Sequence, residues 1–169
     1  MDIKGIAIAK QMDDRRNVLR YPNGPLSPAA PIVPTADTFD TNPTNLERTT
    51  DGNFDTATGD GSKVLGGAGT VGQLIYDLGS VKTVTVGGKV GLSQNGSATV
   101  RVLVDSSQNG LDYINSTSIL FSTTLTSNRI EELLAQTVTG RYIRIRIYST
   151  AACTAVAKFY QIFAHAQGV

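Results

Sequence analysis

The stretch Arg141-Tyr142-Ile143-Arg144-Ile145-Arg146-Ile147-Tyr148 decides the fold of this chain, because apolar and polar residues alternate in it without a break. Successive side chains of a β-strand point to opposite faces, so the three isoleucines share one face while the arginines and tyrosines share the other. β-Branched and aromatic side chains also suit a pleated, half-buried surface. The stretch therefore predicts a strand with a buried isoleucine face and an outward cationic face.

The composition favours one β domain with many turns. The chain has 169 residues, of which 17% are charged and 17 are glycine. A domain of this length buries roughly 70% of its unfolded surface. The formal net charge of +1 excludes a globally basic nucleic-acid binder, so we expect no nucleic-acid partner.

Single copies of cysteine and histidine limit the chemistry that the chain can perform. Cys153 is the only cysteine, which excludes an internal disulfide, and its small neighbours predict a packed thiol. His165 is the only histidine, with no apparent partners for a catalytic triad or a zinc site. We therefore expect a protein that is not an enzyme.

From about residue 49 onward the sequence reads as strands separated by turns. Asn95-Gly96 and Asn109-Gly110 are tight-turn signals, because both residue types tolerate positive φ. Ile130–Gln136 is the one plausible helical turn. Six or more strands without alternating helices predict an all-β fold, an antiparallel jelly-roll β-sandwich. The expected strands are Gln73–Leu78, Val81–Val90, Ala98–Val104, Ser118–Thr124, Arg141–Tyr148 and Ala155–His165.

Prolines mark an extended N-terminal arm. All six lie between Tyr21 and Asn45, and four recur at every third position from Pro25 to Pro34. Proline donates no backbone hydrogen bond, so this segment favours extended geometry and cannot be a central strand. We expect a Pro-rich arm over residues 10–45, after a first strand over residues 1–9. The arm lies either on its own sandwich or on a neighbouring subunit, and our hypothesis is the second, which gives a symmetric oligomer. Its expected anchors are Ile32, Val33 and Phe39.

Several short motifs follow the order that one known family shows. They are Asp51-Gly52-Asn53, Leu74–Val84, Val100–Asp105, Asn109–Tyr113 and Gly140–Ile147, and Ile6–Lys10 is similar to the family's first strand. Over most of residues 46–166 the chain resembles discoidin-type domains, also called coagulation-factor C-type or galactose-binding-like domains, and we expect a discoidin-like β-sandwich over residues 46–169. The resemblance implies an eight-stranded jelly roll whose loops at one end bind glycans, lipid headgroups or proteins. It implies no catalytic activity, and a fold alone does not assign a function.

The aromatic residues depart from a sugar-binding pattern. The chain has no tryptophan, whereas stacking on a sugar ring favours large aromatic faces. Ala57 stands near the position where the family often carries an aromatic residue. Tyr21, Tyr113 or Tyr160 are the candidates to replace it.

One loop carries closely spaced oxygen ligands. Asp51, Asn53 and Thr56 supply a carboxylate, an amide oxygen and a hydroxyl, which a hard cation such as Ca²⁺ prefers. Relatives with a structural calcium add a carboxylate from the last strand, and the resemblance places Gln161 there. The loop is therefore either a calcium site or an Asx-type turn held by its own hydrogen bonds.

Arg144 and Arg146, flanked by Tyr142 and Tyr148, form a cationic and aromatic stripe. The stripe is either a solvated outer face or a contact with another protein, because arginine and tyrosine are enriched at interface hot spots.

Two functions remain open. The first is a non-enzymatic structural protein on a virion surface, as a capsid decoration or tail-surface protein, attached through the arm to other subunits. The N-terminus is no signal peptide and no segment is apolar enough to span a membrane, which favours synthesis in the cytoplasm before assembly onto a virion or another extracellular surface. The alternative is a carbohydrate-binding module or lectin with glycan partners.

Overall fold

The structure, a computed structural model, describes residues 32–51, 53, 55–95, 98–113, 118–124 and 127–166. A long antiparallel ribbon runs through it, because strands β3 (Gly69–Asn95) and β6 (Arg129–Ser149) pair along most of their length. The other elements are β1 (Thr35–Asp37), the short 3-10 helix η1 (Leu46–Thr49), β2 (Gly61–Leu65), β4 (Thr99–Ser107), β5 (Ser118–Thr124) and β7 (Cys153–Ala166).

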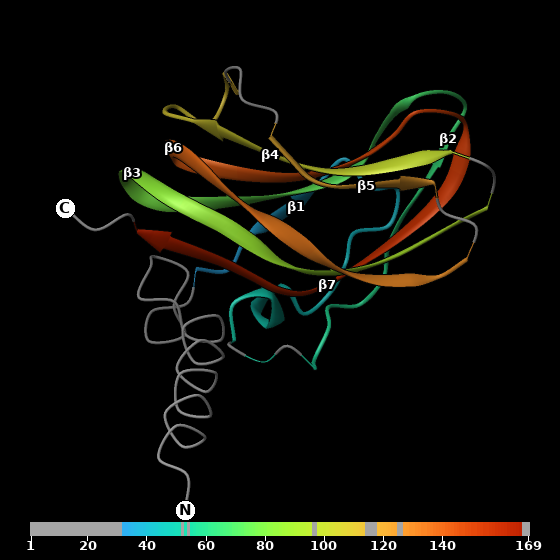
Figure 1. Cartoon of the computed structure of the whole chain (residues 1–169), viewed down its shortest axis with the longest axis horizontal. Coiled ribbons are helices and arrows are strands. Elements are labelled where there is room, and N and C mark those ends of the chain that lie inside the picture. Colours follow the sequence, from blue (N-terminus) through green and yellow to red (C-terminus); the bar gives the residue numbers. More distant parts are fainter. Residues whose placement is uncertain are drawn as a thin grey trace, which may run out of the picture.

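The ribbon contributes to both layers of a sandwich. Its register shifts between Asp77 and Lys82, where Gly79 has a φ of 75° that favours glycine. One half of the ribbon pairs with β1 on one side and with β4 and then β5 on the other, which we name layer A. The other half pairs with β7 and then β2, which we name layer B. Figure 1 shows β4 and β5 on one side of the molecule and β7 on the other.

The predicted antiparallel β-sandwich is confirmed. Ser118–Thr124 is a strand with the expected bounds, whereas the two strands expected over Gln73–Leu78 and Val81–Val90 belong to the single strand β3. The first strand expected over residues 1–9 lies outside the described residues.

The helical turn expected at Ile130–Gln136 is wrong, because these residues lie in β6. Leu133 is buried against the core, while Ile130 and Leu134 are 56% and 69% exposed. Pairing with β3, in which Leu133 stands opposite Gly88, supplies the backbone hydrogen bonds of this segment. Sheet pairing and burial thus override the weak helix preference of its leucine, glutamate and alanine residues.

Valine and isoleucine side chains from both layers form the core. Ile143, Ile145 and Ile147 are at most 1% exposed, as their alternation predicts. Cys153 is buried at the edge of the same cluster, as expected of a packed thiol. The side chains between the isoleucines point to the outer face of layer A, which positions the first candidate site.

The described part of the arm, residues 32–45, lies on its own sandwich. Thr35–Asp37 forms the edge strand β1 beside β3, which agrees with extended geometry. Ile32 and Phe39 pack against the core, and the Phe39 ring meets Phe159 edge to face, with centroids 6.5 Å apart. Among the described residues, no helix is long and apolar enough to cross a membrane.

Candidate functional site

A buried carboxylate joins the two arginines of the cationic stripe. Asp105, on β4, stands opposite Arg144 of β6, and its side chain is only 4% exposed. Its Oδ2 accepts hydrogen bonds from Arg144 Nε at 3.0 Å and from Arg146 Nε at 3.2 Å. The two arginine side chains are 19% and 21% exposed. We name these three residues the arginine cluster, which is half-buried rather than freely solvated.

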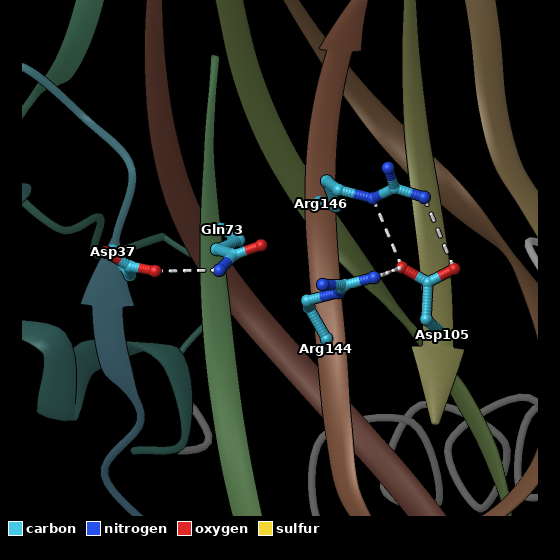
Figure 2. Close-up of polar contacts among 5 residues, drawn as sticks. All are labelled: Asp37, Gln73, Asp105, Arg144 and Arg146. Atoms are coloured by element: carbon cyan, nitrogen blue, oxygen red, sulfur yellow. Dashed lines mark hydrogen bonds and ion pairs between the residues drawn. The ribbon is translucent and has the colours of Figure 1, made fainter. Parts of the chain in front are cut away.

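The arginine cluster continues into a polar row that crosses four strands (Figure 2). Arg146 stands opposite Gln73 of β3, and Gln73 stands opposite Asp37 of β1. Gln73 Nε2 donates to Asp37 Oδ2 at 2.9 Å. Figure 2 shows that this bond turns the amide oxygen of Gln73 toward the strand of the arginines. The outer face of layer A therefore offers guanidinium donors beside an amide acceptor.

An aromatic ring fixes one guanidinium. Tyr113 lies with its ring centre 3.8 Å from Arg144 Cζ, which is the geometry of a cation–π contact. Burial raises the pKa of the Tyr113 hydroxyl, and Arg144 opposes that shift. The phenol therefore stays protonated at neutral pH and adds no charge to the arginine cluster.

A groove on layer B forms the second candidate site. It has a volume of about 340 Å³ and crosses β3, β6 and β7 on their outer face. Gly91 forms its floor, opposite Ile130 on one side and Lys158 on the other. A Cβ at Gly91 would stand 3.3 Å from Tyr160 Cε2, closer than an ordinary contact, so the glycine lets the Tyr160 ring lie against the groove floor. The residues that matter most for its chemistry are Asp60, Gly91, Arg129, Ile130, Lys158 and Tyr160.

The groove contains both charged and apolar groups. Lys158 Nζ lies 3.3 Å from Asp60 Oδ1, and Arg129 Nε lies 2.6 Å from Glu131 Oε1. Lys89 Nζ stands 4.9 Å from the centre of the Tyr160 ring. The two ion pairs balance their own charges, and Lys89 adds a positive charge beside the Tyr160 ring, so donors and acceptors both lie along the rim.

A polar cleft of about 430 Å³ lies where β4 ends. Ser107 Oγ accepts from the backbone of Gly110 at 2.9 Å, and Asn109 Nδ2 donates to Asp112 Oδ2 at 2.9 Å. Gly110 has a φ of 78°, as the predicted Asn-Gly turn requires. The polar side chains that line the cleft hydrogen-bond one another and hold this turn in shape.

The Asp51 loop is held by its own hydrogen bonds. Asp51 Oδ1 accepts from the backbone of Asn53 at 2.8 Å, and Asp51 Oδ2 accepts from Thr56 Oγ1 at 3.0 Å. Asn53 Oδ1 accepts from the backbone of Asp55 at 2.9 Å. Its oxygen donors fit Ca²⁺ in kind, but no group of three or more His, Cys, Asp or Glu side chains gathers among the described residues. The geometry is that of the Asx-type turn, one of the two alternatives expected for this loop.

Gln161 lies on β7, close to the point where the residues that follow the Asp51 loop hydrogen-bond to that strand. The backbone of Thr58 donates to Phe159 O at 2.8 Å, two positions before Gln161. Gln161 is fully buried, and its Nε2 donates to Ile162 O at 3.2 Å. Its side chain therefore has a structural role on β7.

The expected arm anchors do not gather into one surface. Ile32 and Phe39 pack on the core, whereas Val33 is 54% exposed. Of the three candidate aromatic residues, Tyr113 contacts the arginine cluster, Tyr160 lines the groove, and Tyr21 lies outside the described residues. Sequence reasoning missed the roles of Asp105 and Gly91, because both depend on which residues face each other across strands.

No family model and no curated protein matches this chain. Similar solved structures include chitosan-binding module 1 from a chitosanase/glucanase of Paenibacillus sp. IK-5, with 15% identity over 79% of this chain and 94% of that one, at a TM-score of 0.42. A CBM32 protein from Clostridium perfringens has 13% identity over 83% and 98%, at 0.42. The CBM32 of AlyQ, in complex with 4,5-unsaturated mannuronic acid, has 25% identity over 79% and 93%, at 0.36.

These neighbours have the galactose-binding-like fold that the sequence resemblance predicts. Each TM-score lies below 0.5, so the likeness assigns no ligand and no partner to this chain.

Proposed function

We propose that this protein is a non-catalytic carbohydrate-binding module whose ligand lies in the groove of layer B. The observation that carries the proposal is the groove whose floor is Gly91, with the Tyr160 ring packed close to it and the paired charges of Lys158 and Asp60 on the rim. Ligand sites in proteins are concave and combine apolar walls with a few placed polar groups. This groove has that combination, with Ile130 as an additional apolar wall.

A sugar matches the groove in three respects. Its C–H faces can contact the Tyr160 ring and Ile130, and its hydroxyl groups can both donate and accept hydrogen bonds. Asp60 supplies acceptors and Lys158 supplies donors on the same rim. The charged groups that line the groove are held in ion pairs, so they require no charged group on the ligand.

The carboxylates of the groove support binding rather than catalysis. Glycoside hydrolysis uses two carboxylic groups that flank the bond to be cleaved. Asp60 is paired with Lys158, and Glu131 is paired with Arg129. Both are therefore held as ion pairs and supply hydrogen-bond acceptors.

The test is a glycan array on the purified protein, followed by calorimetric titration of the best glycan into two glycine variants. Gly91→Val adds a side chain to the groove floor. Valine suits a β-strand, and among the described residues Gly91 is not one of those with a positive φ. Gly66→Val is the control, because no atom lies within 4 Å of the added Cβ. We expect Gly91→Val to weaken binding about tenfold or more, and Gly66→Val to change it by about twofold or less. Equal affinities of the two variants would contradict the groove as the site.

The virion-surface role stays a prediction. Its main support is the proline-rich segment before residue 32, which lies outside the described residues.

A further inference from the structure

The arginine cluster on the outer face of layer A holds a local positive charge. In the arginine cluster, two guanidinium groups share the single carboxylate of Asp105, which leaves a net charge of +1. Asp37, whose negative charge would balance that of the cluster, lies two strands away from β6 and is bonded to Gln73. Because the arginine side chains are only about one-fifth exposed, water solvates this charge less well than it would at an open surface.

The guanidinium groups also retain hydrogen-bonding capacity. Each arginine has five N–H donors, and Asp105 takes only part of them through Nε and Nη2. Tyr113 against Arg144 and Asp105 beneath both arginines hold the groups in place. Their donors therefore lie in a fixed arrangement, which is favourable for bidentate binding of a carboxylate.

Acceptors lie next to these donors. The Gln73 amide oxygen faces the arginine strand in Figure 2, and the Asp37 carboxylate stands one strand further away. Strands are spaced about 4.8 Å apart, so this acceptor edge lies roughly 5–10 Å from the arginines. A ligand that fits the face has a carboxylate at one end and hydroxyl donors at the other. A sugar acid has both, whereas the acidic side chain of a peptide has only the carboxylate.

We infer that the arginine cluster binds the carboxylate of a uronic acid residue in an acidic glycan, while the Gln73 amide oxygen accepts from the hydroxyl groups of that residue. This site is on the opposite face of the sandwich from the groove. The inference rests on the proposed function only for the class of ligand.

The experiment titrates tetragalacturonate, its methyl ester and tetraglutamate into the full chain. Methyl esterification removes the charge and retains the hydroxyl groups, while tetraglutamate retains the charge and lacks them. We expect tetragalacturonate to bind more tightly than either probe by about tenfold or more, an advantage that decreases as salt is raised. Equal binding of the methyl ester would overturn the role of the arginines. Equal binding of tetraglutamate would overturn the sugar in favour of an acidic protein partner, and no binding of tetragalacturonate would overturn the site.

Two arginine variants locate the binding. Arg146→Gln leaves Asp105 paired with Arg144, and Arg141→Gln removes an equal charge from the same strand, where Arg141 is paired with exposed Asp77. We expect Arg146→Gln to weaken tetragalacturonate binding about tenfold and Arg141→Gln about twofold or less, with Gly91→Val unaffected. Loss of binding in Gly91→Val alone would show that the acidic glycan binds in the groove and would overturn the arginine site. If Arg146→Gln does not fold, the NMR signals of the arginine Nε groups in the unaltered protein decide. The ligand must shift those of Arg144 and Arg146, and a shift at Arg141 alone contradicts the site.

Discussion

Ile145 occupies the centre of the stretch that sets the fold, and it is fully buried. Truncation to alanine removes buried methyl groups and leaves a cavity, so Ile145→Ala should lower the free energy of unfolding by about 2–5 kcal/mol. Ile130→Ala is the matched control on the same strand, because Ile130 is 56% exposed. Surface substitutions usually change stability by about 0.5 kcal/mol or less. Urea denaturation of both variants measures the difference, and equal losses would contradict the register of β6.

Asp105 and Asp77 provide a second comparison between two ion pairs of β6. Asp105→Asn should destabilise the protein by about 3 kcal/mol, because it leaves two half-buried guanidinium groups without a counter-charge. Asp77→Asn should cost about 0–1 kcal/mol, because the Asp77–Arg141 pair is exposed. Hydrogen bonds from Arg141 and from the Gly79 backbone lower the pKa of Asp77 to about 2, so Asp77 is charged at neutral pH and its substitution removes a charge. Thermal or urea unfolding checks the ranking, and a larger loss in Asp77→Asn would contradict it.

The sequence predicted the side of β6 on which each residue lies, because alternation alone determines it. Ile143 and Arg144 are therefore on the expected faces. The sequence could not show that Asp105 pairs with both arginines, since Asp105 lies 39 and 41 positions away and the contact depends on the register of β4. Gly91 likewise gains its role only when β7 and β6 bring Lys158 and Ile130 beside it.

At the scale of elements, the Asp51 loop is either a calcium site or a turn held by its own hydrogen bonds, and an unfolding experiment can distinguish the two. Both Asp51 carboxylate oxygens accept hydrogen bonds from within the loop, so the loop can hold its shape without a cation. Any ligand that binds only the folded state raises the melting temperature. We expect EDTA and added Ca²⁺ to leave the melting temperature unchanged, and Asp51→Ala to lower it equally in both. A calcium-dependent rise that Asp51→Ala abolishes would contradict the turn and establish the calcium site of the sequence resemblance.

The bounds of the elements agreed with the sequence at one strand. Ser118–Thr124 was predicted at its observed bounds, but Ile130–Gln136 was assigned to the wrong type of structure. Its local composition suits a short helix, and only pairing with β3 makes it a strand. The sequence places an interruption at residues 79–80, between two expected strands, but not the continuation of the chain through Gly79 as the single strand β3, which contributes to both layers only once the sandwich is formed.

For the whole molecule, we predict that self-association depends on the arm, residues 10–45. Residues 32–45 include β1 and pack on their own sandwich through Ile32 and Phe39, so the deletion must leave them intact. We expect a chain that lacks residues 11–31 to remain folded and to lose self-association, because the proline-rich segment would contact a neighbouring subunit. Size-exclusion chromatography with light scattering compares the two masses. If both chains have the same oligomeric state, the arm does not mediate assembly.

The groove of layer B is the central claim for the whole molecule, and ligand mapping by NMR tests it most directly. The measurement titrates the best glycan of the array into isotope-labelled protein and follows the backbone amide signals. The account predicts that the largest shifts cluster at Gly91, Lys158 and Tyr160, which line the groove. Shifts that cluster instead at Ser107, Asn109 and Asp112, around the polar cleft, would contradict it.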